Sequence, residues 1–193
     1  MELTRAQAYQ ILIKYVSKNS LISHCLSVEA AMNFYANWFN EPTELWKICG
    51  LLHDFDYEIH PDANRHPKDG AVILRESNVP EEIILAILSH GTNSGIPRNT
   101  NLRKVLFACD EITGLITACA LVRPSKSILD MQVGSIKKKW KNKAFASGAN
   151  RDEMIDGAQL LGISLWDHVS NVLKAMQSIA TDISLDGSAQ KQD

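Results

Sequence analysis

The chain has 193 residues, of which 45% are hydrophobic and 22% are charged. This size and composition are typical of one folded domain with a sizeable core. The formal net charge of −2 at pH 7 argues against a protein that binds nucleic acid polymers, because neutralising many phosphates requires a basic surface. No apolar run is long enough to span a bilayer, and charged residues interrupt the first apolar segment, so we expect neither a signal peptide nor membrane association.

Four cysteines bear on the cellular compartment. Cys25, Cys49, Cys109 and Cys119 show no CxxC spacing and lie in apolar, helical contexts. We therefore expect reduced thiols buried in the core, which favours a cytoplasmic protein.

Apolar residues recur with helical periodicity along the first third of the chain. The pattern predicts helices over residues 3–19, 21–39 and 41–55. Ser20 is the expected N-cap of the second helix, and Pro42 lies near the start of the third. A polar loop is expected over residues 56–65.

The rest of the chain continues the helical pattern. Helices are expected over residues 67–78, 80–90 and 101–121, with a loop rich in turn formers at 91–100 and a stop before Pro124. The last predicted helix covers residues 164–180. Residues 181–193 are small and polar, and we expect them to form a disordered tail. No strand pattern is convincing, so the predicted fold is all-α.

Histidine and aspartate side chains occupy positions in these segments where burial would be costly. His24 lies on the core face of the second helix, and His53 and Asp54 end the apolar stripe of the third. A lone buried carboxylate needs a cation or several donors. The further candidates are His66 before the helix at 67–78, His90 at the end of the helix at 80–90, and Asp110 on the apolar face of the long helix. Imidazole and carboxylate are the usual ligands of divalent metal ions.

The order of these residues resembles the HD-domain superfamily of metal-dependent phosphohydrolases. The order runs His24, His53-Asp54, His66, His90, Asp110. The resemblance implies a single HD-domain helical bundle over residues 1–180, with a metal core at about 20–125 and C-terminal helices at 126–180.

The same resemblance implies the metal ligands. His24, His53, Asp54 and Asp110 would hold one divalent ion, and His66 and His90 a second, with Asp54 bridging the two. Mn, Fe, Co, Ni, Zn and Mg are all compatible with this set. His60 is an alternative to His66, but no helix follows its loop.

A closer similarity concerns "RHPKDGAVILRESNVPEEIILAILSHGT" and "LRKVLFACDEI". These stretches are similar to HD-type symmetrical diadenosine tetraphosphatases. Beyond Asp110 the sequence departs from them, because "ITGLITACALVRPSKSI" lacks their Ile-Glu-Pro-x-Arg continuation. In this respect the chain is also similar to uncharacterised predicted HD hydrolases.

Basic residues could bind the phosphate of a substrate. Arg123 and Lys126, after the long helix, are the first candidates, and Lys68, two residues past His66, is a third. A lysine run is more often a solvated helix face than a binding site. We favour that interpretation for Lys137, Lys138, Lys139, Lys141 and Lys143.

The function implied is hydrolysis of a phosphomonoester or phosphoanhydride of a small phosphorylated molecule, with His53 and Asp54 as catalytic residues. The substrate would be a nucleotide or a dinucleoside polyphosphate, with diadenosine tetraphosphate as the first specific candidate. One alternative is a di-iron oxygenase acting on a small polyol or a phosphonate-like substrate, which the same ligands would serve. Another is a non-catalytic module that binds a nucleotide. The sequence leaves a homodimer open.

Overall fold

The computed structural model describes residues 3–91 and 93–188. Within them the secondary structure consists of nine helices and one isolated β-bridge, between Ser127 and Asp186, which confirms the all-α prediction. The helices are α1 Arg5–Tyr15, α2 Asn19–Phe39, α3 Thr43–Leu52, α4 Lys68–Glu76, α5 Glu81–His90, α6 Asn101–Leu121, α7 Val133–Trp140, α8 Arg151–Leu160 and α9 Leu165–Gln177.

The starts of the first two helices show how local chemistry fixes the chain. A reciprocal capping box begins α1, in which Gln7 N–H donates to Thr4 Oγ1 and Thr4 N–H donates to Gln7 Oε1. The expectation that Ser20 caps α2 is wrong, because α2 begins at Asn19 and its N-cap residue is Lys18. The carboxylate of Glu58 takes that role from a distant loop, since it accepts the Lys18 N–H at 2.7 Å.

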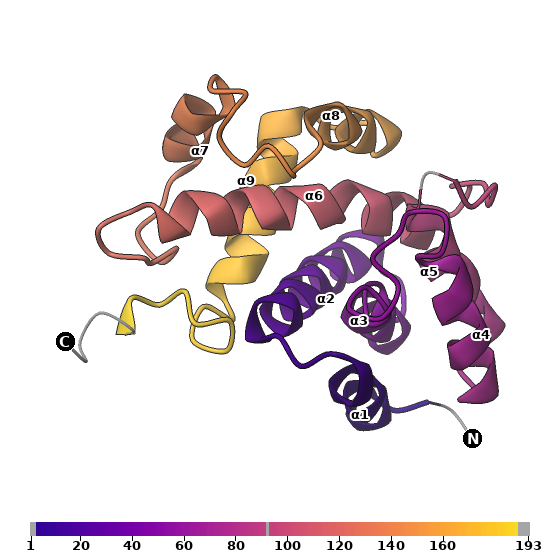
Figure 1. Cartoon of the computed structure of the whole chain (residues 1–193). Coiled ribbons are helices and arrows are strands. Elements are labelled where there is room, and N and C mark those ends of the chain that lie inside the picture. The colour runs from indigo at the N-terminus through magenta and orange to yellow at the C-terminus, as the bar shows by residue number, and fades with distance from the viewer. Residues whose placement is uncertain (1–2, 92, 189–193) are drawn as a thin grey trace.

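Helix α6 runs across the molecule and divides it (Figure 1). The helices α7 and α8 lie on one side of it, and α2 and α3 lie on the other, with α9 crossing behind. Two glycines allow the closest approaches. A Cβ on Gly50 would lie 2.8 Å from Glu29 Cα, and one on Gly157 would lie 2.6 Å from Ala108 Cα. The backbones of α2 and α3, and of α6 and α8, therefore pack directly against each other.

The core is apolar and includes the four cysteines. All four thiols are free and buried, as the sequence predicts. Burial raises the pKa of the Cys49 thiol above its ordinary value, as it does for the others. Because the thiolate is the reactive form, these cysteines act as core residues.

The expected disordered tail differs from the structure over residues 181–188. Ile183 and Leu185 are only 3% and 4% exposed. The Ile128 N–H donates to the Leu185 carbonyl at 2.8 Å, and this tie joins the segment to the loop that follows α6. The sequence suggested disorder because most residues of this segment are small or polar. Two apolar side chains, Ile183 and Leu185, are enough to hold it against the core. Residues 189–193 lie outside the described residues.

No helix in the described part of the chain is both long and apolar enough to cross a bilayer.

A buried hydrogen-bond chain ties α9 to α2 and α6. The Tyr35 hydroxyl lies 2.6 Å from His168 Nδ1, and His168 Nε2 lies 2.8 Å from the Ala108 carbonyl oxygen. Nε2–H must donate to that carbonyl, so Nδ1 accepts from the hydroxyl, and Asn171 Nδ2 donates to the same hydroxyl at 3.3 Å. Burial disfavours the charged ring and lowers the pKa of His168 to about 4.

The lowered pKa of His168 predicts how the free energy of unfolding changes with pH. His168 ordinarily titrates near 6.5 in the unfolded chain, so the unfolded state binds more protons as the pH falls from 6.5 toward 4. The stability that neutral His168 contributes is present above pH 6.5 and is lost through that window. We expect the gap in unfolding free energy between wild type and His168→Gln to shrink by about 2 kcal/mol between pH 7 and pH 5.

Urea unfolding in the presence of a chelator measures this gap. The comparison of two chains cancels other titrating groups, such as Glu111, which contribute equally to both. Parallel stability curves for the two chains across pH 5–7 would contradict the prediction.

Candidate metal centre

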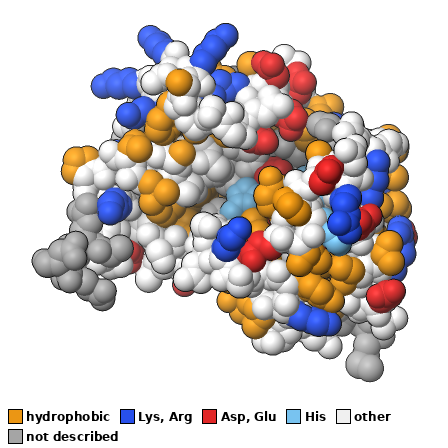
Figure 2. Space-filling view, in the orientation of Figure 1, with side chains coloured by type: hydrophobic (Ala, Val, Ile, Leu, Met, Phe, Trp, Pro, Cys, Tyr) orange, Lys and Arg blue, Asp and Glu red, His pale blue; other side chains and the backbone are white. Residues whose placement is uncertain are grey.

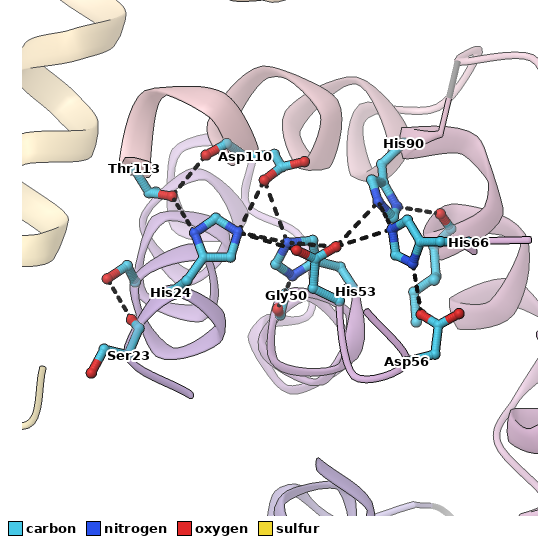
Figure 3. A network of polar contacts seen from close by, with 12 residues as sticks. Ser23, His24, Gly50, His53, Asp56, His66, His90, Asp110 and Thr113 are labelled. Atoms are coloured by element: carbon cyan, nitrogen blue, oxygen red, sulfur yellow. Dashed lines mark hydrogen bonds and ion pairs between the residues drawn. The ribbon is translucent and has the colours of Figure 1, made fainter. Parts of the chain in front are cut away.

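Six side chains from five segments meet in two adjoining groups between α2, α3, α5 and α6, and five of the six are labelled in Figure 3. They are His24 from α2, His53 and Asp54 directly after α3, His66 before α4, His90 at the end of α5 and Asp110 from α6. All six were singled out in the sequence, and the structure brings all six together.

The first group joins α2, the end of α3 and α6. His24 Nε2 lies 3.1 Å from His53 Nε2 and 3.1 Å from Asp110 Oδ1. His53 Nε2 lies 3.5 Å from the same Asp110 oxygen and 3.6 Å from Asp54 Oδ1. Each of the four residues therefore offers one donor atom to a common centre that could hold a metal ion.

The second group lies on the other side of Asp54. His66 Nε2 lies 3.2 Å from Asp54 Oδ1, His90 Nε2 lies 3.5 Å from it, and the two Nε2 atoms are 3.1 Å apart. Asp54 thus belongs to both groups.

The backbone fixes the tautomer of two of the histidines. His53 Nδ1 lies 2.8 Å from the Gly50 carbonyl oxygen, and His90 Nδ1 lies 2.6 Å from that of Ile87. A carbonyl oxygen only accepts, so Nδ1 carries the proton in both rings. The Nε2 atom of each neutral ring is then left with a free lone pair facing the centre.

Side chains fix the other two rings in the same way. Thr113 Oγ1–H donates to the Asp110 carbonyl at 2.7 Å, which leaves the hydroxyl oxygen to accept the Nδ1–H of His24 at 3.2 Å. His66 Nδ1–H donates to Asp56 Oδ1 at 2.8 Å. Such partners set the orientation and basicity of metal-bound histidines.

This geometry fits divalent ions. Two Nε2 lone pairs at 3.1 Å repel each other unless a positive charge lies between them. Ligand atoms that bind one ion at about 2.0–2.2 Å lie roughly 3–3.5 Å apart, and the separations in both groups have this size. The imidazole and carboxylate donors suit zinc, iron, manganese, nickel or cobalt.

The electrostatics of the centre also favour positive charge. Burial opposes the charged form of His53, but the carboxylates of Asp54 and Asp110 outweigh it and raise the pKa of His53 to about 9. Burial likewise opposes charge on His66, whose pKa Asp54 and Asp56 raise to about 10. The pKa of Asp54 lies well below its ordinary value despite burial, because the histidines stabilise the carboxylate. The centre therefore attracts either protons or metal ions.

A cleft of about 340 Å³ opens over the centre. The lining residues that were not predicted as site residues include Tyr57, Glu111 from α6 and Glu153 from α8. Burial and the neighbouring Asp110 raise the pKa of Glu111 to about 7, and burial raises that of Glu153. None of the described residues that line this cleft is a lysine or an arginine.

The three predicted phosphate-binding residues lie outside the cleft. Arg123 follows the end of α6, which extends about 16 Å past Asp110, and its guanidinium pairs with Asp130 at 2.6 Å. Lys126 is exposed in the loop beyond, and Lys68 is exposed at the start of α4. The structure does not bring these three side chains into the cleft, and their role in phosphate binding stays a prediction.

The remaining candidates also stay apart from the centre. His60, the alternative to His66, belongs to neither ligand group. The five lysines of residues 137–143 are exposed and project from the α7 corner of the molecule, as Figure 2 shows. Two of them, Lys137 and Lys139, lie 5.0 and 5.1 Å from the ring centroids of Trp166 and Phe145. This arrangement agrees with a solvated helix face.

Four neighbours of the ligands were missed for identifiable reasons. Asp56 stands two residues after Asp54 and is fully buried, but the polar segment around it suggested a loop. Glu111 follows Asp110 directly, and adjacent helical residues point in different directions. Thr113 and Glu153 show no signal in the sequence beyond their residue type.

Comparisons with known proteins bear on this arrangement. The family model described as HD domain matches residues 21–115, the part of the chain that contains all six converging residues. No curated protein matches the chain. No solved structure matches it either.

Asp56 provides a test of the second ligand group. We expect Asp56→Ala to weaken Mn²⁺ binding at one of two sites by about 10- to 100-fold, because His66 loses the acceptor that orients its ring. Asp56→Asn should retain much of the affinity, since an amide oxygen still accepts the Nδ1–H. Calorimetric titration of the metal-free protein with Mn²⁺ measures both sites.

The matched control is Asp69→Asn, which removes an exposed carboxylate paired only with Arg65 in the same segment. An unchanged two-site titration curve for Asp56→Ala would contradict the role given to Asp56.

Proposed function

The chain belongs to the HD-domain family through residues 21–115, and from this premise we propose that it is a metal-dependent phosphohydrolase. It would cleave a phosphomonoester or phosphoanhydride bond, with a nucleotide as the substrate class. The single observation that carries the proposal is the pair of ligand groups that share Asp54. Two adjacent cation sites suit the attack of water on phosphorus, in which negative charge gathers on several oxygens at once.

His24, His53, Asp54 and Asp110 would hold one ion, and Asp54, His66 and His90 the other. Divalent ions bound there supply positive charge to the phosphate oxygens and lower the pKa of a coordinated water. The set of ligands is compatible with Mn, Fe, Co, Ni, Zn and Mg, and its four imidazoles favour the transition metals.

The protein's own residues set the geometry of this reaction. Asp54 and His53 act as catalytic residues by their place in the centre, since Asp54 fixes the relative position of the two ligand groups. Thr113 and Asp56 hold the rings of His24 and His66 in the orientation that binding requires. The cleft walls limit how a phosphate group can approach the centre.

Positive charge for the substrate would come from the ions rather than from basic side chains. No lysine or arginine is among the described residues lining the cleft, so phosphate binding by Arg123 and Lys126 stays a prediction that the cleft lining does not support. Lys68 stays a prediction for a substrate that extends beyond the cleft. The diadenosine tetraphosphate assignment likewise stays a prediction from sequence resemblance.

One observation favours a second candidate. The absence of basic side chains from the described cleft lining suits a substrate with little negative charge. A di-iron oxygenase would use the same four histidines and two aspartates, and a described lining without basic side chains favours a small polyol as its substrate over a phosphonate-like molecule, which is negatively charged. We also predict a cytoplasmic location, which the four free thiols favour. A homodimer stays a prediction.

The hydrolase proposal predicts the effect of one isosteric change. We expect Asp54→Asn to lower turnover by about a thousandfold or more, because several kcal/mol of transition-state stabilisation depend on the ions. The measurement is product formation from a panel of mononucleotides, dinucleoside polyphosphates and simple phosphate esters, with Mn²⁺ present. Asp54→Asn, purified in the same way, itself controls for contaminating phosphatases, whose activity it would not lower, and His60→Gln, outside both ligand groups, controls for a histidine substitution as such.

Absence of hydrolysis by the wild type over the whole panel would contradict the proposal. Oxygen consumption by the iron-loaded protein would then support the oxygenase. Nucleotide binding without either reaction would support a non-catalytic module.

Gly114 offers a second test of the cleft. It lies in α6 one turn beyond Asp110 and lines the cleft, and a Cβ there would meet no other atom within 4 Å. We expect Gly114→Ala to raise the unfolding free energy by about 0.5–1 kcal/mol, because glycine is costly inside a helix. Gly114→Leu should keep the fold, fill the cleft and lower kcat/KM.

The control is Gly134→Leu in α7, which also has open space around it but lies outside the cleft. Equal activity of Gly114→Leu and Gly134→Leu would show that substrate does not use this cleft.

A further inference from the structure

A second hollow of about 380 Å³ adjoins the cleft over the metal centre. The two share three lining residues, His24, Tyr57 and Pro61, so they lie next to each other, and together they are called the groove below. In Figure 2, histidine side chains are visible at the bottom of the depression in the middle of the face. Any small molecule bound at the centre therefore has the second hollow directly beside it.

The two parts of the groove differ in chemistry. The cleft over the centre is lined by carboxylates and imidazoles, whereas the second hollow presents the apolar surfaces of Leu21, Tyr57 and Pro61. A molecule that spans both parts needs one end that binds cations and another end that is apolar. A phosphate ester with a ring-bearing alcohol has this division.

Tyr57 stands at the junction of the two parts. Its side chain is unusually open for an aromatic residue, since 47% of the residue is exposed. Its ring also meets the His66 ring edge-on, with centroids 5.3 Å apart and an interplanar angle of 86°. The ring is thus anchored beside a metal ligand. Exposed aromatic rings bind planar groups by stacking.

The charges of the second hollow do not suit a chain of phosphates. Lys18 is the one lysine or arginine among the described residues that line the groove. Glu58 lines the same hollow, and its carboxylate, bound to the Ser17 and Lys18 N–H groups, offsets the lysine charge. Affinity in this part must come mainly from apolar contact.

We propose that the hollow bounded by Leu21, Tyr57 and Pro61 is a subsite for the planar ring of the substrate, with Tyr57 as the residue that selects it. This inference rests on the proposed hydrolase function and narrows it. The substrate is a compact phosphate monoester of a ring-bearing alcohol, with its phosphate at the metal centre and its ring against Tyr57.

Steady-state kinetics with three esters tests the subsite: adenosine 5′-monophosphate, para-nitrophenyl phosphate and glycerol 3-phosphate, which has no ring. Tyr57→Ala should raise KM for the two ring-bearing esters by about 10- to 100-fold, the loss expected for one stacked ring. The rise in KM should be at least about fivefold smaller for glycerol 3-phosphate, and kcat for that ester in the same variant measures any effect of the missing ring on His66. Tyr57→Phe should restore the wild-type KM, because it keeps the ring.

Ile59→Ala is the matched control, since Ile59 is 41% exposed in the same loop but lines neither part of the groove. An equal rise in KM for all three esters, or no rise for the ring-bearing ones, would overturn the subsite.

A separate binding experiment distinguishes failure of the subsite from failure of the hydrolase proposal. Adenosine, which carries no phosphate, is titrated into the Mn²⁺-loaded wild type and into Tyr57→Ala by calorimetry. Binding that the alanine variant loses supports the subsite even if no ester is hydrolysed. Equal binding to both proteins, or binding to neither, overturns it even if hydrolysis is observed.

Discussion

The negative charge of two partly buried carboxylates is the constraint on which the centre of this protein depends. Asp54 and Asp110 lie among imidazole rings, and no lysine or arginine is among the described residues that line the cleft above them. Each ring directs its Nδ1 proton away from the centre, so its Nε2 atom compensates the carboxylates only by taking up a second proton and otherwise presents a lone pair to a cation. A buried carboxylate without a cation is costly. Bound metal ions would supply the missing positive charge. The same requirement explains why ligand atoms from five segments of the chain meet at this centre.

Packing between helices then holds the donors within the distances that an ion requires. Gly50 lets α3 approach the backbone of α2, and Gly157 lets α8 approach that of α6. The buried chain from Tyr35 through His168 to the Ala108 carbonyl joins α2, α9 and α6. The C-terminal helices therefore brace the two long helices that carry His24 and Asp110, and α8 also adds Glu153 to the cleft.

Residue type and periodicity predicted the helices and the six converging residues, because a ligand must lie on an apolar face to be buried with the core. The same reasoning failed where partners come from distant segments. The cap of α2 is Glu58, 40 residues from Lys18, and Asp56 reaches His66 from what reads as a polar loop. Arg123 lies beyond the end of α6, so the structure does not bring it to the cleft. The local sequence pattern therefore predicts which side chains are buried. Which residue forms a hydrogen bond with each of them depends on how distant segments pack together.

The charge of the groove limits what it can bind. The carboxylates of Asp54, Asp110, Glu111 and Glu153 would together balance the charge of two divalent ions. This balance leaves no excess positive charge for a chain of several phosphates, because Glu58 already offsets Lys18. The ions can thus orient a single phosphate, while the apolar surface around Tyr57 supplies the remaining affinity and the selectivity.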